Sequence, residues 1–143
     1  MRITIKLALA CSCILAFSAF SFQRTIQDKY PLNGEWKPIR QEMGGRAMPP
    51  EYYAKHLLVL QDTNYVFTAE SVDIGVSKYA DGKMDITGKE GVNTGRSFKA
   101  LYELKKDTLS ICYNLKGDQY PASLSTQGQP MYFLSVYIRN NKE

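Results

Sequence analysis

Few residues in this chain of 143 have the side chains that nucleophilic, acid–base or metal chemistry requires. His56 is the only histidine, so a Ser-His-Asp triad or a multi-histidine metal site would have to use it or not exist. It stands at the start of an apolar segment, which favours a structural or surface role. The chain also has no Cys-x-x-Cys motif, so structural zinc is not expected. The sequence therefore predicts neither a metal site nor a cofactor.

Paired carboxylates are the remaining route to catalysis, since acid–base work on sugars needs two such groups with separated pKa values. Asp85, Glu103 and Asp107 are candidates by residue type alone. Asp107 precedes Thr108 at a turn, where aspartate usually accepts hydrogen bonds from backbone amides. Glu103 lies on the polar face of its segment. The sequence thus predicts a protein without catalytic residues.

Two binding classes are also disfavoured. The glycine-rich stretch Gly88–Gly95 lacks a following helix and a Gly-Lys-Ser/Thr ending, so it predicts a loop and not a phosphate site. The basic residues are spread along the chain, and nucleic-acid binding needs them clustered. We therefore expect no nucleic-acid partner.

Aromatic residues are the positive signal for function, with ten tyrosines, six phenylalanines and one tryptophan. Phe67, Tyr102 and Tyr113 lie on the apolar faces of their predicted strands. Alternate residues of a strand share a face, so we expect these three to line one continuous cavity. Two interpretations stay open. The rings either fill the interior of the domain, or they border a ligand cavity in which the hydroxyls orient the ligand.

The first 21 residues are predicted to be a signal peptide. A short basic start precedes an apolar run from Leu7 to Phe22, and Ala19-Phe20-Ser21 matches a small-x-small cleavage pattern. An uncleaved anchor helix is one alternative. Lipidation at Cys11, which would tether the protein to a membrane, is another. We expect a periplasmic or extracellular protein, or a membrane-anchored lipoprotein if Cys11 is lipidated.

Cleavage would leave a polar lead-in, residues 22–31, and one domain, residues 32–143. Loss of Arg2 and Lys6 reduces the 18 basic residues to 16, against 14 acidic ones, so no strongly charged partner is implied. Cys112 would remain as a lone cysteine, which excludes an internal disulfide. Alternation places Cys112 on the face opposite Ile111, and no base stands near it in the sequence. A packed structural thiol is therefore expected.

The domain has the pattern of short strands separated by turns. Alternation is clearest in Ser97–Leu104 and Thr108–Leu115, around a turn at Lys105-Lys106-Asp107. Pro38 should confine the first strand to an edge or a bend. Regular short strands without long helices are typical of a closed barrel or a sandwich. The predicted elements are strands over Gly34–Arg40, His56–Gln61, Tyr65–Glu70, Val72–Lys78, Lys83–Thr87, Ser97–Leu104, Thr108–Leu115 and Tyr132–Arg139, one short helix over Pro49–Lys55, and a long loop over Lys116–Pro130.

Gly34-Glu35-Trp36 and the late Arg139 resemble the Gly-x-Trp and the closing arginine of lipocalin-type β-barrels. The Tyr-Glu-Leu of Tyr102–Leu104 and the Asp-Thr-Leu-Ser-Ile-Cys-Tyr of Asp107–Tyr113 are similar to an uncharacterised bacterial lipocalin-like domain family. The similarity runs in order from Leu32 to Arg139. It implies that Gly34, Trp36 and Arg139 form the closure of the barrel, with the indole buried and the guanidinium stacked on it.

Together these features predict an all-β fold, a small antiparallel lipocalin-like β-barrel of about eight strands with one short helix. The expected function is non-catalytic binding of a small apolar or amphipathic ligand in the cell envelope. The alternative is a cavity-less barrel that acts as a protein-interaction or inhibitor module on an envelope protein. Its contact surface would be the Lys116–Pro130 loop or the Met43–Lys55 segment. The presence or absence of a cavity separates the two.

Overall fold

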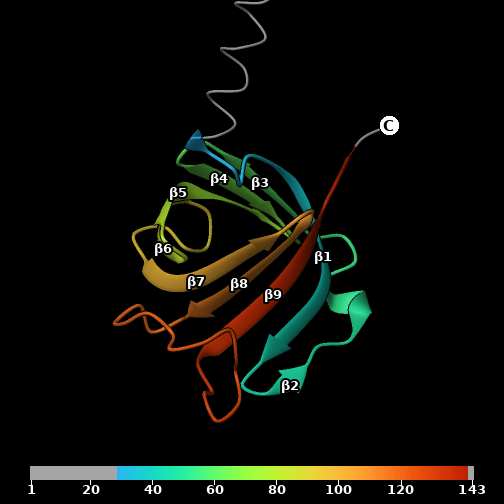
Figure 1. Cartoon of the computed structure of the whole chain (residues 1–143), viewed down its shortest axis with the longest axis vertical. Helices are drawn as coiled ribbons and strands as arrows, with labels where there is room; N and C mark the ends of the chain where they lie inside the picture. Colours follow the sequence, from blue (N-terminus) through green and yellow to red (C-terminus); the bar gives the residue numbers. More distant parts are fainter. Residues whose placement is uncertain (1–28, 142–143) are drawn as a thin grey trace, which may run out of the picture. The chain divides into compact units, whose positions relative to one another are not determined.

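The computed structural model describes residues 29–141, and its residues from Leu32 onward form a closed antiparallel β-barrel (Figure 1). Eight strands, β1 and β3 to β9, pair in sequence order, and β1 closes the barrel by pairing with β9. The extra strand β2 pairs with the end of β1. The strands are β1 (Gly34–Met43), β2 (Arg46–Ala47), β3 (Leu57–Gln61), β4 (Asn64–Thr68), β5 (Val72–Ala80), β6 (Lys83–Glu90), β7 (Ser97–Lys105), β8 (Thr108–Asn114) and β9 (Tyr132–Arg139).

This architecture confirms the predicted all-β barrel of about eight strands. The predicted short helix is a single 3-10 turn, η1 (Pro50–Tyr52), with prolines at its start. No helix in the described residues is both long and apolar enough to span a membrane. The predicted signal peptide and the lipidation site at Cys11 lie outside the described residues.

Tight hairpins build one end of the barrel. The turns Asp62-Thr63, Asp81-Gly82 and Lys106-Asp107 join β3 to β4, β5 to β6 and β7 to β8. Asp81 and Gly82 have φ of 51° and 76°, the positive pair that a two-residue type I′ turn demands. The turn predicted at Lys105-Lys106-Asp107 is confirmed. We call this end of the barrel the closed end.

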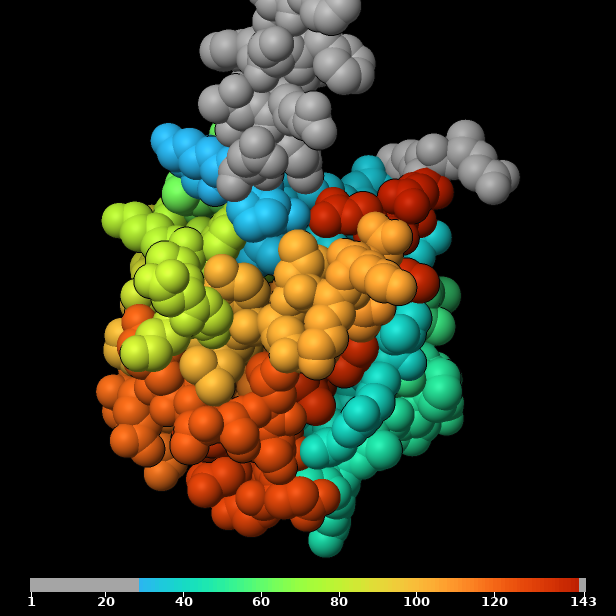
Figure 2. All heavy atoms as spheres, viewed as in Figure 1, coloured from blue at the N-terminus to red at the C-terminus, as the bar shows by residue number. Residues whose placement is uncertain are grey.

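Longer connections lie at the opposite end, which we call the loop end. They include residues 69–71 between β4 and β5, residues 91–96 between β6 and β7, and residues 115–131 between β8 and β9. The last of these spreads over the surface as a broad patch of orange atoms in Figure 2. The connections at the loop end are therefore longer than the hairpin turns at the closed end.

Pro38 lies at a bend, as predicted. β1 pairs with β3 through Gly34–Trp36, and beyond that point its partner is β9. The pairing with β9 shifts register between Pro38 and Arg40. A proline lacks the N–H that a ladder bond needs, so it is tolerated at such a bulge.

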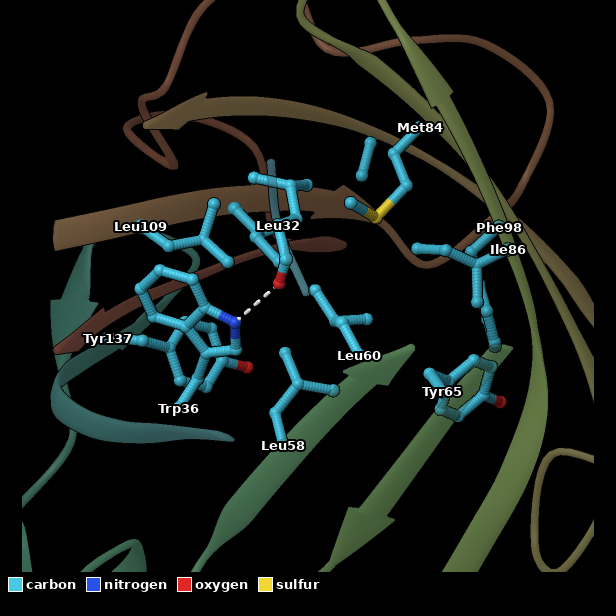
Figure 3. Packing of buried hydrophobic residues seen from close by; sticks show 12 residues of the cluster. Leu32, Trp36, Leu58, Leu60, Tyr65, Met84, Ile86, Phe98, Leu109 and Tyr137 are labelled. Carbon is cyan, nitrogen blue, oxygen red and sulfur yellow. Dashed lines mark hydrogen bonds between the residues drawn. The ribbon is translucent and has the colours of Figure 1, made fainter. Parts of the chain in front are cut away.

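The structure has two hydrophobic clusters on opposite sides of the β8–β9 wall. The larger fills the barrel around Trp36, Leu60 and Leu109 (Figure 3). The smaller lies outside the barrel and consists of Cys112, Tyr132 and Leu134 packed against the long loop at Leu124. Cys112 faces away from Ile111 as predicted, and the loop buries it completely. Burial raises the pKa of its thiol to about 11, which is consistent with a packed structural thiol.

Trp36 closes the barrel at the closed end. Its indole is fully buried, and Nε1 donates a hydrogen bond of 2.8 Å to the carbonyl oxygen of Leu32 (Figure 3). The guanidinium carbon of Arg139 lies 4.2 Å from the indole ring centroid. Arg139 also donates from Nη1 to the Asn33 carbonyl at 2.6 Å. A Cβ on Gly34 would stand 2.6 Å from that nitrogen, so glycine leaves the room that the arginine occupies. The structure thus brings Gly34, Trp36 and Arg139 together at the closed end.

Candidate ligand-binding cavity

The barrel interior contains a cavity of about 260 Å³. Its wall is mainly apolar and aromatic and receives side chains from every barrel strand except β1. At about 30 Å³ for each water-sized group, the space corresponds to roughly nine such groups. It therefore suits a molecule with on the order of ten heavy atoms. The lining residues are Leu58, Leu60, Tyr65, Phe67, Asp73, Ser77, Met84, Ile86, Asn93, Arg96, Phe98, Ile111, Tyr113, Leu115, Phe133 and Tyr137.

The cavity lies toward the loop end and reaches the surface there. Leu115 directly follows β8 and Phe133 lies near the start of β9, both at the ends of the long loop, and Asn93 and Arg96 come from the β6–β7 loop. Arg96 is exposed, with its guanidinium carbon 5.0 Å from the centroid of Phe98. A small molecule would thus meet Arg96 at the entrance and aromatic rings beyond it.

Two of the three residues predicted to line a cavity do so. Phe67 on β4 and Tyr113 on β8 are part of the wall. Tyr102 on β7 is not, and this prediction requires correction. Its ring packs edge-on against Tyr79, with centroids 5.5 Å apart, and the Tyr79 hydroxyl accepts a hydrogen bond from the backbone N–H of Leu32. Tyr102 therefore belongs to the packing at the closed end and not to the cavity wall.

A chain of hydrogen bonds reaches Tyr113 through the barrel wall. Gln41 Nε2 donates to Ser135 Oγ at 3.2 Å, Ser135 hydrogen-bonds the Tyr137 phenol, and the hydroxyls of Tyr137 and Tyr113 lie 3.4 Å apart. Gln41, Ser135 and Tyr137 are all buried. Burial raises the pKa of both phenols, so both are neutral at physiological pH. The chain fixes the Tyr113 ring at the cavity surface.

Asp73 on β5 is a buried carboxylate in the same wall. It accepts hydrogen bonds from the Tyr65 hydroxyl at 2.8 Å, from the Asn93 backbone N–H at 3.0 Å and from Asn93 Nδ2 at 2.9 Å. Burial, with the neighbouring Asp73, raises the pKa of the Tyr65 phenol. Asn93 Oδ1 in turn accepts from Arg96 Nη1 at 3.3 Å. This network ties the β6–β7 loop to the barrel beside the entrance.

Glycine makes the approach of Tyr65 possible. Gly75 follows Asp73 on the inner face of β5, where the pairing with β6 shifts register. A Cβ at Gly75 would lie 2.2 Å from the Thr87 carbonyl oxygen and 2.6 Å from Cε1 of Tyr65. The Tyr65 ring therefore occupies space that any other residue at position 75 would need.

Ser77 completes the inner face of β5. It is 1% exposed, and its Oγ has no hydrogen-bond partner within the described residues. The sequence analysis missed Asp73 and Ser77 as site residues. One signal for them was available, because Asp73, Gly75 and Ser77 alternate along one face of a strand and all are small or polar. A run of three small or polar residues on the core-facing side of a strand indicates a space that something else must fill.

The residues considered for catalysis lie outside this wall. Asp85 pairs with Lys99 at 2.8 Å, Glu103 with Lys105 at 2.9 Å, and Asp107 with Arg139 at 3.6 Å. Each of the three carboxylates is thus exposed and paired with a basic side chain.

His56 packs its ring edge-on against Phe67, with centroids 5.3 Å apart. Its Nδ1 is buried and without a partner in the described part of the chain, and burial lowers its pKa. The His56 ring therefore supports Phe67 from behind the cavity wall.

The predicted Gly88–Gly95 loop is β6 up to Glu90 and a loop from Gly91 onward. Comparison with protein-family models, with curated proteins and with solved structures finds no match to this chain.

Proposed function

We propose that this barrel binds one small, mainly apolar molecule in its interior cavity and does so in the cell envelope after export. Protein interiors are packed as densely as organic crystals, and they hold few voids larger than a water molecule. A space of about 260 Å³ in the barrel is the observation that carries the proposal. The predicted signal peptide supports the location.

The chemistry of the wall supports a ligand that is mostly hydrocarbon. Binding cavities for small molecules are typically apolar and aromatic, with a few polar groups that fix orientation. Phe67, Phe98, Phe133 and Tyr113 supply rings to this wall, and the polar groups are few. The alternative function predicted from the sequence, an interaction module, assumed a barrel without a cavity. The cavity argues against that premise.

Naphthalene, with ten carbon atoms, matches the cavity in size and is the probe that tests the proposal. Isothermal titration calorimetry should show one binding site with a dissociation constant in the micromolar range, which corresponds to a binding free energy of about −8 kcal/mol. Phe67→Trp adds volume to the wall and should weaken binding at least tenfold. Tyr102→Phe is the matched control, because Tyr102 lies outside the wall, and should leave binding unchanged.

The natural ligand can be sought by native mass spectrometry of the protein purified from its own envelope. A co-purified molecule with on the order of ten heavy atoms would support the proposal. Absence of naphthalene binding to a folded protein would contradict it.

A further inference from the structure

Resting on the proposed function, we infer that the ligand carries an uncharged oxygen, as in an alcohol or a ketone, at the end that enters first, and that this oxygen hydrogen-bonds the Ser77 hydroxyl. Ser77 lies on the inner face of β5 and is part of the cavity wall. Its Oγ is buried and has no hydrogen-bond partner within the described residues. Buried polar groups in native proteins almost always have a partner, so this hydroxyl calls for a group that the chain itself does not supply.

The other polar side chains of the cavity wall already hydrogen-bond one another. The pairs are Tyr113 with Tyr137, Tyr65 and Asn93 with Asp73, and Arg96 with Asn93. Among the lining residues that the structure describes, Ser77 is therefore the one polar side chain without a partner in the wall. It is the place where a ligand gains a hydrogen bond without breaking one inside the protein.

Ser77 lies deep in the barrel. β5 runs from Val72 at the loop end to Ala80 at the closed end, and Ser77 comes four residues after Asp73, which lies beside the entrance. At about 3.3 Å per residue, this separation is roughly 13 Å along the strand. The backbone N–H of Ser77 donates at 2.8 Å to the carbonyl oxygen of Thr63, in the β3–β4 turn of the closed end. A ligand that enters at the loop end thus meets Ser77 with its leading end.

The surroundings of Ser77 favour an uncharged group. Its partner across the β5–β6 ladder is the buried, apolar Ile86. The charged side chains of the wall are Asp73 and Arg96, and both lie at the loop end. A charged group beside Ser77 would lose its water without gaining a counter-ion, which is costly. A serine hydroxyl both donates and accepts, so an alcohol or a ketone satisfies it.

Three probes of one ring system test the inference by isothermal titration calorimetry at pH 7. Naphthalene has no oxygen, 2-naphthol adds an uncharged hydroxyl, and 2-naphthoate adds a charged carboxylate. We expect 2-naphthol to bind about 3- to 10-fold more tightly than naphthalene, as one net hydrogen bond predicts. It should bind at least tenfold more tightly than 2-naphthoate. Equal affinities for 2-naphthol and 2-naphthoate would overturn the requirement for an uncharged group.

Ser77→Ala should abolish the 3- to 10-fold advantage of 2-naphthol and leave naphthalene within about twofold of its original affinity. Ser123→Ala is the matched control, because Ser123 is exposed in the β8–β9 loop and lies outside the cavity wall. The unfolding temperature of each variant reports that it is folded. An advantage that survives Ser77→Ala would overturn the inference, as would equal affinities of the unmodified protein for naphthalene and 2-naphthol.

The orientation of bound 2-naphthol can be measured in the unmodified protein, independently of any variant. An isotope-filtered nuclear Overhauser experiment should give cross-peaks from the ring protons beside the hydroxyl to Ser77, and from the other ring to Phe133 near the entrance. Cross-peaks from the hydroxyl-bearing ring to Arg96 instead would overturn the inference. All of these contrary results leave naphthalene binding, and with it the proposed function, intact. Failure of all three probes to bind would overturn the proposed function and the inference together.

Discussion

Removal of the Trp36 indole should destabilise the barrel more than most single substitutions. The side chain is fully buried among Leu32, Leu109 and Tyr137 (Figure 3). A buried tryptophan removes up to about 250 Å² from water, which at about 25 cal/mol per Å² sets an upper bound of roughly 6 kcal/mol. Truncation of large core aromatics to alanine typically costs about 3 to 5 kcal/mol. We expect about 4 kcal/mol for Trp36→Ala.

Urea unfolding followed by far-ultraviolet circular dichroism measures this loss, because Trp36 is the only tryptophan and its fluorescence disappears with it. For a domain of this size the loss corresponds to roughly 15 °C in Tm. Ile39→Ala on the same strand is the control. Ile39 is 52% exposed, so its truncation should change the free energy of unfolding by less than about 0.5 kcal/mol.

The contribution of Arg139 can be separated by a double-mutant cycle with Trp36→Leu and Arg139→Gln. The guanidinium lies over the ring and also donates to the Asn33 carbonyl, and the cycle isolates the first contact from the second. We expect a coupling free energy of about 0.5 to 2 kcal/mol. A loss below about 1 kcal/mol for Trp36→Ala would refute the assigned role of the indole as the closure of the barrel.

Three further predictions concern pH, thiol reactivity and export. Burial lowers the pKa of His56, an effect that Glu70 partly opposes, so the unfolded chain binds a proton more readily than the folded one. The free energy of unfolding should therefore reach its maximum contribution from His56 above pH 6.5 and decrease as the pH falls below that value. Urea titrations of His56→Phe should lack this decrease. Cys112 is fully buried and burial raises the pKa of its thiol to about 11, so it should resist iodoacetamide in the folded protein at pH 8 and react rapidly in urea. Peptide mass spectrometry measures the extent of labelling. Rapid labelling of the folded protein would contradict the burial of Cys112. The exported protein should begin between Ala19 and Gln23 by intact mass, whereas a lipidated N-terminus at Cys11 would overturn the predicted cleavage.

Much of the barrel could be predicted because its strands follow local rules. Ser97–Lys105 and Thr108–Asn114 alternate apolar and polar residues, and their turn has the expected residues. The extra strand Arg46–Ala47 was missed, since two residues carry no periodicity. The full burial of Cys112 also depends on residues that are distant from it in the sequence. Alternation gives its face, but only the fold of residues 115–131 shows that this outer face is covered.

The cavity was harder to predict, for two physical reasons. Alternation tells which face of a strand a residue occupies but not its height in the barrel, so Tyr102 was grouped with Tyr113 although it packs at the closed end. The inner face of β5 also departs from the rule that inward-facing residues of a strand are apolar. Ser77 points inward with Asp73 and Gly75, while Val72 on the other face is 49% exposed. The bulge at Gly75 and the contacts of Asp73 with Tyr65 and Asn93 are tertiary effects.

The most direct test of the central claim is an isotope-filtered nuclear Overhauser experiment on labelled protein with unlabelled naphthalene. The account predicts cross-peaks from naphthalene protons to the side chains of Phe67, Ile111 and Tyr113, and none to Tyr102. Cross-peaks confined to exposed residues such as Val92 or Tyr52 would contradict a ligand inside the barrel.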